Sequence, residues 1–414
     1  MAEAAFYDIH CHALTLSHPS FLAFVETVRS RRMETLYAQA RSPGFLAGSL
    51  FLKGGERVRN MLSVMENDVG SIFALMEDDL LGLYAKPGDP PPLASEGGLE
   101  LGGLRFGRVV LAPLLMDFER RGGARTEAYY DRPPEKPMAA QVRDVLAGIR
   151  DYRRARPRGL LEIRPFLGID TSNYTEAALQ ALLESSFRGY RRGKAASRAA
   201  FEAMADIDVD RADDFPMRFA GVKVYPPLGF DPWPDGGPGR DKAGLLYSFC
   251  ESRDIPLTAH CDDQGFRVIP LDEAWLYTAP SRWRPALEAH PGLRLDLAHF
   301  GHQYLRPLGR PQPGEWAEGI LGLLGDFARV YTDFSFNGCE PEYYRWLLEL
   351  LGRQDPGLRS VALDRVMFGS DFPVNLTKVR SYADYCRLFA DSPLPEDWKR
   401  RFCSDNPERF LTGD

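Results

Sequence analysis

Short apolar runs rich in β-branched residues recur along this chain, and a stretch with helical periodicity follows most of them. Such alternation is typical of parallel β/α architectures, in which each strand returns to the sheet through a helix. Eight runs have this character, and eight is the number of strands in a (β/α)8 barrel. They are Phe6–His12, Arg108–Leu114, Leu161–Leu167, Gly221–Tyr225, Pro256–His260, Leu293–His299, Arg329–Asp333 and Arg365–Gly369. We therefore predict an α/β fold, a (β/α)8 TIM barrel.

Two segments are longer than a barrel needs, and we predict that they are insertions within a single domain spanning residues 1–414. The first, residues 30–104 after the first strand, contains two helical patterns and then KPGDPPPLASEGG. Its proline and glycine content predicts an irregular surface loop. The second, residues 170–216 after the third strand, carries a basic run followed by an acidic one. We interpret it as a solvated helix with its loop, and a lid over the site is the alternative.

The composition is that of an ordinary globular protein with a sizeable core, since 44% of residues are hydrophobic and 26% are charged. A formal net charge of −7 argues against nucleic acid or an anionic membrane as the main partner. No run approaches the roughly 20 apolar residues that cross a bilayer, and no signal peptide is apparent. Six cysteines without a CxxC pair indicate reduced thiols. We expect a cytoplasmic protein that acts on a small molecule. The sequence is compatible with a homo-oligomer and does not decide the oligomeric state.

Histidines stand at the ends of three predicted strands. The chain has only seven histidines, and four of them close the runs FYDIHCH, IPLTAH and LRLDLAH. These four are His10, His12, His260 and His299. Because the C-terminal ends of barrel strands form the active-site face, we expect these imidazoles to gather there.

The first strand carries the sequence Asp-Ile-His-Cys-His. Side chains alternate between the two faces of a strand, so His10 and His12 are expected to point the same way. Two imidazoles at this spacing can bind one divalent ion, and Asp8 would lie one step deeper as a supporting polar group. Ile9 and Cys11 are then expected to face the surrounding helices.

The eighth strand ends in Phe-Gly-Ser-Asp-Phe-Pro, which places Asp371 at the mouth of the barrel. Gly369 permits close backbone approach, and Pro373 ends the strand. A lone aspartate at this point is commonly a turn or cap residue. Opposite several histidines, however, its carboxylate completes a donor set that suits a catalytic zinc-type site with an open position.

Taken together, these motifs resemble the amidohydrolase superfamily. DIHCH, TAHCDD, LAHFGH, MFGSDFP and DNPERFL occur in that order between residues 6 and 411. More specifically, they resemble the branch of amidohydrolase-related hydrolases and non-oxidative decarboxylases such as aminocarboxymuconate-semialdehyde decarboxylase. The resemblance implies one divalent metal ion. We expect Zn²⁺, because imidazole and carboxylate ligands suit it, although Mn²⁺, Fe²⁺ and Co²⁺ are compatible.

The resemblance also implies a role for each matching residue. The implied metal ligands are His10, His12, His260 and Asp371. Asp371 would in addition act as the general base. His299 would contact the substrate or transfer a proton, and His302 is either its companion at the substrate or a plain loop histidine.

A lysine in the fourth strand, Lys223, leaves two interpretations open. In some relatives a lysine at this place is carboxylated and bridges two metal ions, whereas the branch resembled here usually has one metal and no carbamate. Lys223 would otherwise bind a substrate carboxylate or be structural. Tyr225 shares its face and would line the pocket. Arg164, in the third strand, would either bind an acidic substrate or form an ion pair within the barrel.

Two reactions fit this set of residues. A divalent metal lowers the pKa of its bound water to about 7, and Asp371 would take the proton while the carbonyl of an amide, ester or lactone is attacked. His299 would stabilise the developing charge. The alternative is a metal-dependent non-oxidative decarboxylase, in which His299 or Asp371 protonates the carbon that loses carbon dioxide. A barrel that binds a ligand without catalysis is a third interpretation, and it predicts no metal.

Overall fold

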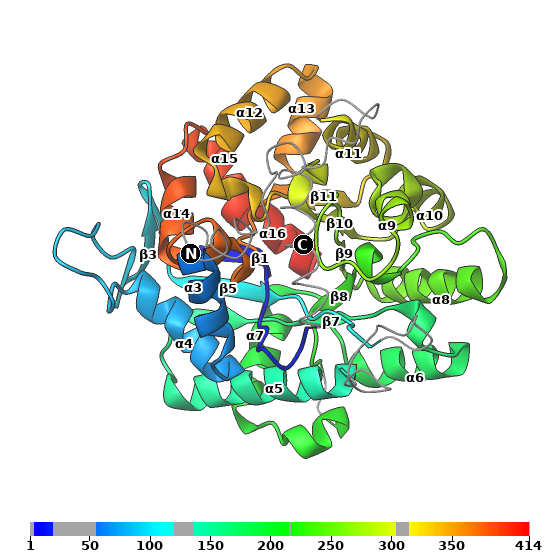
Figure 1. Cartoon of the computed structure of the whole chain (residues 1–414), viewed down its shortest axis with the longest axis horizontal. Helices are drawn as coiled ribbons and strands as arrows, with labels where there is room; N and C mark the ends of the chain where they lie inside the picture. The colour runs from blue at the N-terminus through cyan, green and yellow to red at the C-terminus, as the bar shows by residue number, and fades with distance from the viewer. Residues whose placement is uncertain (1–3, 20–54, 120–135, 215–216, 304–313, 414) are drawn as a thin grey trace, which may run out of the picture.

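The computed structural model describes residues 4–19, 55–119, 136–214, 217–303 and 314–413, and short strands at its centre are surrounded by helices (Figure 1). Nine parallel strands of this part of the chain lie in two sheets, with the orders β1-β5-β6 and β12-β11-β10-β9-β8-β7. Their bounds are β1 Ala5–Cys11, β5 Arg108–Pro113, β6 Leu161–Ile163, β7 Phe166–Gly168, β8 Gly221–Val224, β9 Leu257–Ala259, β10 Leu295–Leu297, β11 Val330–Asp333 and β12 Val366–Met367. Each predicted strand therefore overlaps an observed one.

Hydrogen bonds connect the two sheets on both sides. A parallel bridge between Leu114 and Phe166 links the end of β5 to β7. On the other side, the backbone N–H of Ile9 donates to the carbonyl of Phe368 over 3.1 Å, just after β12. The strand order is that of a parallel α/β fold and is consistent with a (β/α)8 barrel. The third predicted strand is split into β6 and β7 around Pro165, which has no N–H to give to the ladder.

Helices follow the strands and return the chain to the next one. Outside the two predicted insertions they include α5 (Met138–Ala155), α8 (Gly237–Arg253), α9 (Leu271–Thr278), α10 (Arg284–Ala289), α11 (Glu315–Asp326), α12 (Pro341–Gly352), α13 (Pro356–Leu363), α14 (Tyr382–Ala390) and α16 (Asn406–Thr412). In the described part of the chain, none of the helices combines the length and the apolar character that crossing a membrane requires.

The segment predicted as the first insertion contains α3 (Gly55–Met65), α4 (Val69–Leu80) and a small antiparallel sheet. Its strands are β2 (Ala94–Ser95), β3 (Gly98–Leu101) and β4 (Leu104–Phe106). The prediction of an irregular loop for KPGDPPPLASEGG is therefore wrong for the last residues of that stretch, which form β2 and begin β3. Gly98 has φ +107°, and a Cβ there would lie 2.2 Å from the carbonyl oxygen of Phe106, so glycine is what permits β3 to pair so closely. Residues 30–54 of this segment lie outside the described residues.

The segment predicted as the second insertion contains α6 (Glu176–Ser186) and α7 (Lys194–Ala203). Its basic run makes ion pairs: Arg192 contacts Asp254 at 2.7 Å, and Lys194 contacts Glu408 in α16. Asp254 precedes β9, so this contact lies at the N-terminal ends of the strands, away from the strand-end histidines. This position fits the predicted solvated helix and not a lid over the site.

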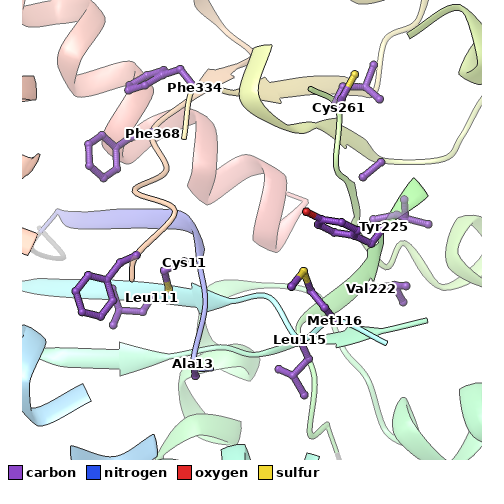
Figure 2. Packing of buried hydrophobic residues seen from close by; sticks show 14 of the residues in the cluster. Cys11, Ala13, Leu111, Leu115, Met116, Val222, Tyr225, Cys261, Phe334 and Phe368 are labelled. Atoms are coloured by element: carbon purple, nitrogen blue, oxygen red, sulfur yellow. The ribbon is translucent and has the colours of Figure 1, made fainter. Parts of the chain in front are cut away.

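One apolar cluster draws side chains from both sheets and therefore lies between them. Its buried members are Ala5, Tyr7, Ile9, Val110, Ala112, Leu114, Phe166, Ala220, Met367, Phe410 and Leu411. Phe410 of α16 fills the N-terminal end of this space, since its ring stacks on Phe166 (centroids 6.5 Å apart, 16° between planes) and meets Tyr331 at 5.3 Å. A larger cluster lies between the strands and the helices, where Phe334 and Phe368 meet with centroids 5.8 Å apart (Figure 2).

The side-chain alternation predicted for the first strand is only partly right. Ile9 belongs to the cluster between the sheets and does not face the helices, whereas Cys11 belongs to the larger outer cluster. The register between β1 and β5 shifts between Asp8 and Cys11, and such a bulge lets neighbouring residues point to the same side. Asp8 accordingly turns to the backbone N–H of Ser370, which donates to it over 2.9 Å.

We predict that Phe410→Ala lowers the free energy of unfolding by about 3–5 kcal/mol, because it removes a buried ring that closes the end of the core. Urea denaturation of the metal-free protein measures this change. The control is Leu83→Ala, at a side chain that is 65% exposed, which should stay within about 0.5 kcal/mol of the native protein. Equal effects of the two substitutions would contradict the role given to Phe410.

Candidate metal centre

Three side chains converge where β1 ends and the chain leaves β12. His12 Nε2 lies 3.1 Å from Asp371 Oδ1, and His10 Nε2 lies 3.7 Å from the same oxygen. All three side chains are buried, and their nearest ligand atoms lie within 4.8 Å of one another. The backbone brings them together directly, because the N–H of Asp371 donates to the carbonyl of His10 over 2.7 Å.

The other ring nitrogen of each histidine decides what this group can bind. His10 Nδ1 lies 2.9 Å from Asp333 Oδ2, and His12 Nδ1 lies 2.8 Å from the carbonyl oxygen of Leu114. An ionised carboxylate and a carbonyl only accept hydrogen bonds, so each imidazole donates from Nδ1 and keeps a lone pair on Nε2. Two lone pairs and one carboxylate oxygen of Asp371 therefore point at one another, and a cation between them satisfies all three.

Electrostatics favour a metal over a proton at this point. Burial, the largest influence, lowers the pKa of His10 to about 3, so its imidazole is neutral at ordinary pH. Burial acts to raise the pKa of Asp333, but the neighbouring His10 and His299 and the Ser335 hydroxyl hold it well below its usual range. Neutral imidazole nitrogens beside an ionised carboxylate are the donor set of zinc and similar divalent ions. The residues present therefore fit a divalent metal ion.

A second group lies beside the first. His299 Nε2 is 3.0 Å from His260 Nδ1, and His260 Nε2 is 3.0 Å from both Asp262 Oδ1 and the carbonyl of Gln264. His299 Nδ1 donates to the carbonyl of Ser335 over 3.1 Å. By the same reasoning, the lone pairs of His260 Nδ1 and His299 Nε2 face each other, and a proton or a metal must lie between them.

The four strand-end histidines thus form one continuous row. Ring centroids are 5.3 Å apart from His12 to His10, 4.7 Å from His10 to His299, and 4.7 Å from His299 to His260. The structure places His260 beside His299 and Asp262, and not within the group of His10, His12 and Asp371. Its implied role as the third imidazole ligand stays a prediction.

Lys223 lies in a polar row across three neighbouring strands. In the register it faces Thr258 of β9, which in turn faces Asp296 of β10. The ammonium is fully buried and has no hydrogen bond or ion pair among the described residues. Burial lowers the pKa of Lys223 to about 8, and Asp333, Asp296, Asp371 and Asp262 act against that shift. The lysine thus lies among the carboxylates of the site. Its carboxylation and its contact with a substrate both stay predictions.

The other residues predicted to bind substrate lie in different places. Tyr225 is in the site, with its ring 4.4 Å from that of His260 and its hydroxyl accepting from the N–H of Phe266 over 3.1 Å. His302 is half-buried in the loop after β10, where its ring meets Tyr343 at 6.2 Å. Arg164 is buried and pairs with Glu162, so the alternative of an ion pair within the fold describes it. Arg164 therefore no longer supports a carboxylate-bearing substrate.

Sequence reasoning missed three aspartates and a serine of this site. Asp333 ends the seventh predicted strand just as His299 ends the sixth, so its position could have identified it. Asp262 lies in the TAHCDD motif, and Asp296 lies within the sixth predicted strand. Ser335 has no such signal, because its hydroxyl reaches the histidines only through a turn of the backbone. Phe336, the next residue in that turn, has a strained backbone with φ of 64°, and His299 and Asp371, which follow β10 and β12, also have positive φ, at 62° and 59°.

Comparisons with known proteins identify the family of this chain. The sequence profile of the amidohydrolase family (Amidohydro_2) matches residues 7–412. Among curated proteins, none matches the chain. A 4-oxalomesaconate hydratase from Rhodopseudomonas palustris is 12% identical, with 98% of this chain and 95% of that one covered and a TM-score of 0.43. A probable 2-pyrone-4,6-dicarboxylic acid hydrolase from Acinetobacter baumannii is also 12% identical, with 75% and 84% covered and a TM-score of 0.40.

The family profile covers nearly the whole chain, from the first strand to the last helix, and this range includes His10, His12 and Asp371. The chain therefore belongs to the amidohydrolase family.

Proposed function

We propose that this protein is a metal-dependent hydrolase on a closed (β/α)8 barrel, acting on an amide, ester or lactone of a small molecule. The observation that carries the proposal is the convergence of His10 Nε2, His12 Nε2 and Asp371 Oδ1. None of these three atoms carries a hydrogen that it could donate to the others, because both imidazoles have their hydrogen on Nδ1. Zn²⁺ is the ion that this neutral, imidazole-rich set suits best. When bound there, such an ion polarises a carbonyl and lowers the pKa of a bound water to about 7.

Residues of the chain would carry out the two proton transfers of the reaction. Asp371 contacts His10 and His12 through Oδ1, and its second oxygen, Oδ2, would accept the proton of the attacking water. A proton held between His260 Nδ1 and His299 Nε2, 3.0 Å apart, is placed for transfer to the leaving group. Burial of the whole row excludes competing water and strengthens these interactions.

The first prediction concerns metal content. Protein purified without chelator should hold about one divalent ion per chain, and His12→Ala should lose it, because the substitution removes one nitrogen of the ligand set. Plasma mass spectrometry measures the content. His290→Ala is the matched control, since His290 contacts Glu251 at the end of α10 and touches neither histidine group. A folded His12→Ala protein with undiminished metal would contradict the proposed site.

The second prediction concerns the reaction. Zinc-loaded protein should hydrolyse members of a panel of amides, esters and lactones, and Asp371→Asn should lower kcat by about 10²–10⁴-fold, as the loss of a general base does. The assay also records carbon dioxide release from hydroxybenzoates and acidic dienes. Carbon dioxide release without any hydrolysis would replace the hydrolase by the non-oxidative decarboxylase and would leave the metal site in place.

A further inference from the structure

Two residues at the end of β11 contact a histidine from each group. Asp333 is fully buried, and its Oδ2 accepts from His10 Nδ1 over 2.9 Å. Its Oδ1 accepts from the backbone N–H of His299 over 3.2 Å, from the backbone N–H of Ser335 over 2.9 Å, and from the Ser335 hydroxyl. In each of these hydrogen bonds the Asp333 carboxylate is the acceptor, as an ionised carboxylate must be.

The Ser335 hydroxyl lies between the two histidine groups. Its oxygen is 3.0 Å from His10 Nδ1 and 2.9 Å from His299 Nδ1. Because its own hydrogen goes to Asp333, the oxygen can only accept from these nitrogens. The hydroxyl therefore favours a hydrogen on Nδ1 of both imidazoles.

We propose that Asp333 and Ser335 form a positioning unit that fixes His10 and His299 in the Nδ1–H tautomer. The consequence is that both Nε2 lone pairs are directed into the site: that of His10 toward Asp371, and that of His299 toward His260. The unit rests on the proposed function only in that His10 serves as a metal ligand. Carboxylates that accept from the second nitrogen of a ligating histidine orient the ring and raise its basicity.

The same unit also holds the backbone of His299. This residue and Phe300 both have left-handed backbone, with φ of 62° and 50°, which costs free energy in residues other than glycine. Asp333 accepts the backbone N–H of His299, and Asn337 Nδ2 donates to its carbonyl over 2.7 Å. These bonds secure both sides of the strained residue, so the end of β11 sets the place of the ring as well as its tautomer.

Nitrogen NMR of histidine in the metal-free protein tests the proposal without reference to activity. Protein labelled with ¹⁵N-histidine, with His10 and His299 assigned through His→Gln variants, should show a hydrogen on Nδ1 of both rings. Asp333→Asn offers His10 a neutral amide that can also donate, so this tautomer should be lost. Zinc affinity, measured by competition with a chelator, should fall by about 10–100-fold.

Glu77→Gln is the matched control, at a buried carboxylate of α4 that accepts from the Tyr152 hydroxyl over 2.9 Å and from the backbone N–H of Leu160, with no hydrogen bond to a histidine among the described residues. Because this carboxylate lies outside the histidine site, both tautomers and the zinc affinity should be unchanged. If Asp333→Asn fails to fold, Ser335→Ala still tests the unit: it removes one of the two acceptors at His299 Nδ1 and leaves the Ser335 carbonyl, so the Nδ1–H preference of His299 should weaken but persist.

Two results would overturn the positioning unit: an Nε2–H tautomer of His10 in the native metal-free protein, or a folded Asp333→Asn protein with native tautomers and native zinc affinity. Failure of the proposed function is distinguishable from either. A native protein that binds no zinc but shows both Nδ1–H tautomers would refute the metal site and would still support the role of Asp333 and Ser335.

Discussion

Acceptor groups behind two histidines determine what this protein can bind. The Asp333 carboxylate and the Leu114 carbonyl each take the Nδ1 hydrogen of an imidazole, so the Nε2 lone pairs of His10 and His12 must point at Asp371. Without such acceptors, either ring could turn a hydrogen toward the carboxylate, and an ordinary hydrogen bond would result. The site thus depends on strands that are not adjacent in sequence: β1 supplies the rings, β5 and β11 hold them, and the end of β12 supplies the carboxylate.

The fold provides these acceptors through its layered interior. Phe410 and the apolar side chains of both sheets fill the N-terminal end, and the row of Lys223, Thr258 and Asp296 lies across the middle strands. The histidines lie at the C-terminal ends of the strands, where loops rather than ladders follow. Burying so many polar groups is unfavourable unless they find partners or a bound ion, which is why their arrangement indicates function and not merely packing.

The sequence predicts the strand order and the strand-end histidines well, because alternating apolar runs and helices leave few other folds for this chain. It misplaces Ile9, since a one-residue shift of register between Asp8 and Cys11 cannot be seen in a period-two pattern. It also misses Ser335, whose hydroxyl contacts His10 and His299 from a turn after β11 that no local sequence pattern marks. Arg164 could be interpreted either way from its strand, and only the position of Glu162 decides for the ion pair. Local pattern therefore predicts the ring-bearing strands, whereas contacts between strands far apart in the sequence set the chemistry.

The central claim is that one divalent ion is held by His10, His12 and Asp371. Anomalous diffraction from crystals grown with zinc, recorded on both sides of the zinc absorption edge, tests it most directly. The account predicts a peak about 2.0–2.2 Å from His10 Nε2, His12 Nε2 and Asp371 Oδ1. No peak at that position, or zinc bound only between His260 and His299, would contradict it.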